Sequence, residues 1–152
     1  MGRLVPSIIM ISFIFIVLTG CNSEPQVKTT DIDQIKIELI EKSEMPNGTA
    51  YTFKLKNLSR FTIAQNNVYL SYPIKTSNGS RGNEFKIEAK NNRLHIKSGE
   101  EIILNAFAPA EEWEDNRKLD TENFILDIIG YIGEVKEGRR FQKSGGIESF
   151  KM

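Results

Sequence analysis

Residues 51–56 read YTFKLK, and this stretch decides the fold class. Aromatic or aliphatic side chains stand at positions 51, 53 and 55, while threonine and two lysines stand between them. Successive side chains of a β-strand point to opposite faces, so this alternation predicts a strand with one buried and one exposed face. We therefore expect Tyr51, Phe53 and Leu55 to lie in a hydrophobic core.

The same period of two recurs along the chain on both sides of this stretch. Apolar and polar residues alternate in further runs, which predict strands at 35–40, 68–75, 85–90, 94–96 and from 124 onward. Residues 101–108 (EIILNAFA) predict a more buried strand, and a final strand is expected around 139–143. Pro73 lacks a backbone donor, so the strand that contains it should end there or lie at an edge.

Turn residues separate these strands at short intervals. They occur at 46–48, 57–60, 77–83, 91–92, 98–100 and 136–138. Only residues 109–119 (PAEEWEDNRKL) favour a helix, because a proline and acidic residues precede two basic ones. Seven or eight short strands with turns every ~8–15 residues predict an all-β sandwich with one short helical crossover. A partly open barrel is the alternative.

The spacing of strands and turns resembles a known class of domain. The segments FKLKNLS, NNVYL and LHIKSGEEIILNAFAP are similar to those of small immunoglobulin-like domains found on bacterial lipoproteins. The resemblance covers residues 34–150 and implies an immunoglobulin-like β-sandwich over residues 34–152. The chain departs from antibody-type domains, because its domain has no cysteine and its single tryptophan, Trp113, lies in the expected helical crossover.

The N-terminal residues have the layout of a secretory signal. Arg3 precedes an apolar run from Leu4 to Leu18, which is shorter than the ~20 residues of a membrane-spanning helix. Residues 18–21 (LTGC) at the end of this run resemble the lipobox of bacterial lipoproteins, and the composition is similar to that of Gram-positive species. An uncleaved anchor helix is the alternative.

The lipobox resemblance implies a specific modification. The signal peptide, residues 1–20, would be cut off between Gly20 and Cys21, and the Cys21 sulfur would carry a diacylglyceryl group. A second acyl chain gives stable anchoring where one alone does not. Residues 21–33 are polar and are expected to form a flexible tether. The domain would then stand at the extracytoplasmic face of the cell membrane.

Composition and motifs argue against catalysis and against nucleic-acid binding. The chain has 20 basic and 20 acidic residues, without a basic block. His95 is the only histidine, and we expect it to point outward from a strand; one histidine without a cysteine in the domain cannot form a usual zinc site. No G-x-S-x-G or phosphate-loop motif is present. We expect no enzyme activity, no metal and no cofactor.

Two features are candidates for an interaction surface. Trp113 stands among the acidic residues of the 111–115 cluster, which could instead bind Ca²⁺ or simply begin a helix. Tyr69 is expected on the exposed face of its strand, with Tyr131 in a similar position on the last long strand. Aromatic residues on such a face either bind a partner or pair across strands.

These observations together predict a membrane-anchored accessory lipoprotein. It would bind another envelope protein through its β-sandwich. The alternatives are a lipoprotein that binds a solute or Ca²⁺, and an envelope enzyme or an inhibitor of one, for which no catalytic pair can be named.

Overall fold

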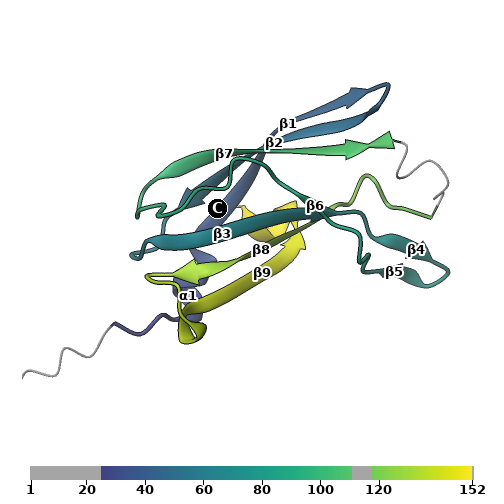
Figure 1. Ribbon diagram of the computed structural model, residues 1–152. Coiled ribbons are helices and arrows are strands. Elements are labelled where there is room, and N and C mark those ends of the chain that lie inside the picture. The colour runs from purple at the N-terminus through teal and green to yellow at the C-terminus, as the bar shows by residue number, and fades with distance from the viewer. Residues whose placement is uncertain (1–24, 111–117, 152) are drawn as a thin grey trace, which may run out of the picture.

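Two antiparallel sheets face each other across one hydrophobic core (Figure 1). The computed structural model describes residues 25–110 and 118–151. Nearly all regular structure in these residues is β-strand, which confirms the all-β prediction. The main strands pair into two separate sheets, and this favours the sandwich over the partly open barrel.

The three-stranded sheet contains the stretch from which the fold was predicted. Its order is β1 (Ile35–Met45), β2 (Gly48–Asn57) and β7 (Glu101–Pro109). Phe53 in β2 lies opposite Leu39 in β1 and Leu104 in β7. Tyr51, Phe53 and Leu55 are at most 1% exposed, so the predicted inward face is confirmed.

The turn between β1 and β2 requires a glycine. Gly48 has φ +147°, a conformation that residues with a Cβ rarely adopt. A Cβ on Gly48 would also lie 2.2 Å from the carbonyl oxygen of Ala108. The Pro46-Asn47-Gly48 signal thus marks a tight turn that also lies against the end of β7.

The four-stranded sheet has the order β6, β3, β8, β9. β3 (Ile63–Ser71) and β8 (Ile125–Ile132) form its centre, with β6 (Ile87–Glu88) and β9 (Arg140–Gly146) at the edges. A separate hairpin, β4 (Ile74–Thr76) and β5 (Gly79–Arg81), follows β3. The break between Ser71 and Ile74 contains Pro73, as predicted.

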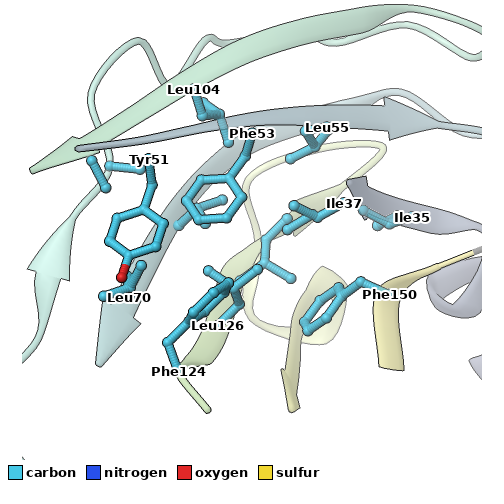
Figure 2. Close-up of a cluster of buried hydrophobic side chains, with 14 of the residues drawn as sticks. Ile35, Ile37, Tyr51, Phe53, Leu55, Leu70, Leu104, Phe124, Leu126 and Phe150 are labelled. Carbon is cyan, nitrogen blue, oxygen red and sulfur yellow. The ribbon is translucent and has the colours of Figure 1, made fainter. Parts of the chain in front are cut away.

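The inner faces of both sheets contribute to the core. The rings of Tyr51 and Phe53 stack with centroids 5.9 Å apart, and Phe124 meets each of them edge-on (Figure 2). The remaining core side chains are aliphatic, apart from Tyr72, Phe141 and Phe150. Phe150 lies in the C-terminal 3₁₀-helix η3 (Ile147–Phe150) and is fully buried. Every fully buried apolar side chain described lies between Ile35 and Phe150, so a chain that begins at Cys21 keeps the whole described core.

Hydrogen bonds connect several loops at one end of the sandwich, the end beside residues 25–34. Leu58 N–H donates to Gln34 O at 3.0 Å, Gly99 N–H to Asn57 O at 2.7 Å and Gly133 N–H to Thr62 O at 2.7 Å. The buried Asn57 amide adds bonds to Phe61 O and Ile96 O, both at 2.8 Å. We call this group of segments, residues 25–34, 57–62, 97–100 and 133–139, the tether end.

The opposite end of the sandwich carries the turns farthest from the N-terminal segment (Figure 1). It contains the β1–β2 turn, the β4–β5 hairpin and residues 110 and 118–121. Ala110 N–H donates to Asn47 O at 3.0 Å, and Lys75 N–H donates to Lys118 O at 2.5 Å. We call this end the far end.

The structure corrects the predicted tether, because its last residues belong to the domain. Residues Thr29–Asp33 form the helix α1, and Val27 packs against the core. Asp31 is 9% exposed, and its carboxylate accepts a hydrogen bond from the Arg60 guanidinium at 3.1 Å. The polar composition of this segment predicted a flexible chain. The contact between the buried Asp31 carboxylate and Arg60 instead holds the segment on the domain. The first part of the predicted tether, 21–24, lies outside the described residues.

Three predictions about individual strands are wrong. The 85–90 strand is reduced to Ile87–Glu88, and Phe85 is 45% exposed instead of buried. Residues 94–96 form no strand, because His95 has φ +54° and this turns Leu94 outward to 60% exposure. β7 is an alternating strand and not a more buried one, because only one of its faces packs on the core and Ile103, on the other face, remains 46% exposed.

The remaining element predictions differ in outcome. The final strand is confirmed as β9, one residue later than expected at its start and longer at its end. In the predicted helical crossover, Pro109 ends β7 and pairs with Gly48. Residues 111–117, which include most of that crossover, lie outside the described residues.

Candidate functional site

The outer face of the four-stranded sheet carries two partly exposed tyrosines. Tyr69 on β3 lies opposite Asp127 of β8 and Glu88 of β6, and Tyr131 on β8 lies opposite Gln65. The neighbours of Tyr69 along β3, Val68 and Leu70, are fully buried, so the period of two places Tyr69 on the outer face. This position is the one predicted from the sequence.

The charged side chains beside Tyr69 are paired with neighbours. Lys86 Nζ donates to the Asp127 carboxylate at 2.6 Å, and Asp127 is only 6% exposed. The Asn67 amide donates to the Glu88 carboxylate. The acids at this site therefore have partners on the same surface, and phenol rings and amides lie beside them.

A shallow depression lies beside Tyr131. It has a volume of about 380 Å³ and is lined by Gln65, Asn67, Ile129, Gly130, Tyr131 and Arg140. Amides, a phenol and a guanidinium can donate and accept hydrogen bonds and can pack flat against a partner, a combination enriched at protein interfaces. We name this surface, Tyr69 and Tyr131 together with the depression, the tyrosine face.

Sequence reasoning missed the polar members of the tyrosine face. The alternation over β3 and β8 would have placed Gln65, Asn67 and Tyr131 on one face, because all three have the same parity as Tyr69 in their paired register. Arg140 lies opposite Tyr131 in the β8–β9 ladder. Its position depends on strand pairing and could not be derived from spacing alone.

A second concavity, also about 380 Å³, lies at the far end. Its lining includes Lys42, Glu44, Thr49, Tyr72 and Thr121. The Lys42 ammonium and Glu44 carboxylate lie 3.3 Å apart. The hydroxyls of Tyr51 and Tyr72 lie 2.6 Å apart at the base of this region. Burial raises the pKa of both phenols, and their mutual hydrogen bond raises that of Tyr51 further. Neutral, buried phenols of this kind stabilise the fold rather than act as bases.

The other predicted site residues have different outcomes. His95 is exposed, as expected, although it belongs to a turn instead of a strand. Gly20, Cys21, Trp113 and the 111–115 acidic cluster all lie outside the described residues, so their proposed roles stay predictions. Over 25–110 and 118–151, no three side chains of His, Cys, Asp or Glu gather as metal ligands would. Within the same ranges, no helix has the length and apolar character needed to span a membrane.

Comparisons with known proteins leave the family open. No family model matches the chain, and no curated protein matches it. Among solved structures, the solution structure of R. palustris CsgH aligns with a TM-score of 0.34 and 8% sequence identity. The alignment covers 77% of this chain and 96% of that chain. A similarity of this size supports no conclusion about function.

Proposed function

We propose that this chain is a bacterial lipoprotein that acts as a binding module for another envelope protein. Lipid on Cys21 holds it at the outer side of the cytoplasmic membrane, and an immunoglobulin-like β-sandwich forms the module. The observation that carries the proposal is the sequence Leu18-Thr19-Gly20-Cys21 at the end of a signal-like apolar run.

The position of the domain along the chain supports this anchor. The first described residue, Pro25, is already tied to the sandwich, because Arg139 Nη1 donates to its carbonyl oxygen at 3.0 Å. The chain is thus held by the domain from a point four positions after Cys21, and the apolar run of residues 4–18 precedes it. An apolar run directly before a folded β domain is the order that a secreted, lipid-anchored protein requires.

A binding role is supported by the tyrosine face. Tyrosine and arginine are enriched at binding hot spots, and the face presents both beside amides. The acidic residues beside it, Asp127 and Glu88, are paired with a lysine and an amide. The residues there suit recognition of a protein surface and offer no nucleophile with an adjacent base.

Metabolic labelling with a fatty-acid precursor tests the anchor. The wild-type chain should incorporate label and fractionate with membranes, whereas Cys21→Ala should carry none. Asn22→Ala, one position beyond the lipobox, is the matched control and should be labelled like the wild type. The lipoprotein proposal is wrong if the wild type takes up no label, or if Cys21→Ala takes up as much.

A further inference from the structure

The tether between a lipidated Cys21 and the domain is short. Pro25 follows Cys21 by four positions, and a fully extended chain of that length spans at most about 14 Å. The tether expected from the sequence was three times as long. If Cys21 lies at the membrane surface, the first residue of the domain must lie within about 14 Å of it.

Hydrogen bonds determine which end of the domain this constraint brings to the membrane. Arg139 donates to Pro25 O at 3.0 Å, and Arg60 Nη2 donates to Gln26 O at 3.1 Å. Both arginines belong to loops of the tether end. The chain therefore leaves the sandwich beside the β8–β9 connection, as Figure 1 shows. The β8–β9 connection must then be among the parts of the domain closest to the bilayer.

This connection presents an apolar side chain to solvent. Gly133, with φ +80°, turns the chain out of β8, and Val135 follows at 59% exposure. Leu58, in the adjacent β2–β3 loop, is 43% exposed. Exposed aliphatic side chains at the tips of loops insert readily among lipid headgroups, where their apolar surface leaves water.

The charged side chains of the tether end balance. Its five bases are Lys28, Arg60, Lys97, Lys136 and Arg139, and its five acids are Asp31, Asp33, Glu100, Glu134 and Glu137. Several of them are paired: Asp31 contacts Arg60, Glu100 contacts Arg93 at 2.9 Å, and Lys136 Nζ lies 2.5 Å from Glu134. The short tether and the exposed apolar side chains, and not a net charge, therefore bring this end to a bilayer.

We propose that the tether end rests on the surface of the phospholipid bilayer, with Val135 and Leu58 in the headgroup layer. This inference rests on the proposed lipid anchor at Cys21. It sets the orientation of the domain: the far end points away from the membrane, and the tyrosine face stands at the side of the anchored domain, open to a partner in the envelope.

Single-tryptophan variants measure this orientation. The chain has one cysteine and one tryptophan, so Trp113→Phe provides a background without tryptophan, and Cys21 provides a unique thiol. The chain 21–152 is coupled through Cys21 to a thiol-reactive lipid in vesicles that contain brominated phosphatidylglycerol. In this background, Val135→Trp should lose fluorescence to bromine quenching, and its emission should shift to shorter wavelength.

The control variant places tryptophan at the far end. Asn78→Trp lies in the β4–β5 turn and should be neither quenched nor shifted. Leu58→Trp serves as the second tether-end variant if Val135→Trp does not give the wild-type circular dichroism spectrum. Equal quenching of the tether-end and far-end variants, or no quenching of either, overturns the inference.

The coupling is chemical, so this result does not depend on whether cells lipidate Cys21. Metabolic labelling decides the lipoprotein proposal, and quenching decides the orientation. Salt gives a further readout, because it screens charge interactions with phosphatidylglycerol. Since the charges of the tether end balance, quenching of Val135→Trp should change little when salt is raised or when brominated phosphatidylcholine replaces brominated phosphatidylglycerol.

Discussion

Asp31 and Arg60, 29 positions apart, connect the helix α1 to the loop between the two sheets through a hydrogen bond of 3.1 Å. The Lys28 backbone N–H also donates to Asp31, at 2.9 Å. This backbone bond, and then the Arg60 guanidinium, hold the pKa of Asp31 below its ordinary value of 3.8. The ionised carboxylate is therefore the form that stabilises the start of the domain.

The direction of the shift in the Asp31 pKa determines how this stabilisation depends on pH. A carboxyl whose pKa is lowered by folding contributes its full stabilisation above its unfolded pKa and loses it as the pH falls through the folded pKa. We predict that Asp31→Asn lowers the melting temperature at neutral pH, and that the difference from wild type disappears as the pH is lowered below 3.8. Thermal unfolding followed by circular dichroism across this range measures it.

A neighbouring substitution controls for the loss of charge. Asp33→Asn removes the same charge from the same helix, but Asp33 is exposed. It should change the melting temperature less than Asp31→Asn at neutral pH. If the two variants are equally destabilised, the Asp31–Arg60 contact does not hold the start of the domain.

Phe53 lies at the centre of the core, and truncation of its side chain should destabilise the fold. It is fully buried, and its ring packs against those of Tyr51 and Phe124. Phe53→Ala should lower the free energy of unfolding by about 3–5 kcal/mol. Phe107→Ala is the matched control, because Phe107 is 39% exposed in the neighbouring strand β7. Its cost should be on the order of 0.5–1 kcal/mol. Urea unfolding compares the two, and similar costs would contradict the described core.

The sequence predicts the centre of this fold well, for a physical reason. In β1, β2 and β3 one sheet face is buried, so the burial of Ile37, Phe53 and Val68 follows from alternation alone. The turn at Gly48 likewise needs a residue type that the sequence shows directly. Local pattern and tertiary structure agree in these elements.

Alternation fails where a segment packs without joining a sheet. Leu94 and Ile96 have the spacing of a strand, but the positive φ of His95 breaks it and leaves only Ile96 buried. Asp31 lies in a polar segment, and its burial is made favourable by the Lys28 backbone N–H and by Arg60, which is far away in sequence. Arg140, the β9 residue of the tyrosine face, likewise reaches its place only through the pairing of β9 with β8. Such contacts between distant residues leave no periodic signal.

The hydrogen bond between the hydroxyls of Tyr51 and Tyr72 predicts a second pH effect, at the alkaline end. Burial, and for Tyr51 also this bond, raise the pKa of both phenols above the ordinary 10.0. Stabilisation by a group with a raised pKa is complete below its unfolded pKa and is lost as the pH rises. The protein should therefore lose stability above pH 10, and both phenols should ionise together with unfolding.

The variant Tyr51→Phe separates this pair from other alkaline effects. It removes one hydroxyl of the pair and should lower the free energy of unfolding at neutral pH by about 1 kcal/mol. It should also reduce the amplitude of tyrosinate absorbance that appears on alkaline unfolding. If the part of the absorbance that Tyr51→Phe removes appears before the loss of circular dichroism, the phenol of Tyr51 is accessible in the folded protein and the described pair is wrong.

The tyrosine face should matter for partner binding and little for stability. Tyr69 and Tyr131 are partly exposed on the outer face of the sheet, so replacing both by alanine removes contact area for a partner without opening the core. We predict that Tyr69→Ala combined with Tyr131→Ala reduces, by about tenfold or more, the affinity for the envelope protein that the wild-type lipoprotein captures from its own membranes. Loss of a hot-spot aromatic typically costs 2 kcal/mol or more of binding free energy, hence that factor.

The matched control is Ile103→Ala with Phe107→Ala, which trims two exposed apolar side chains from the outer face of the other sheet. This control should capture the partner normally. Equal capture by both double variants, with each retaining the wild-type circular dichroism spectrum, would place the binding surface elsewhere on the domain.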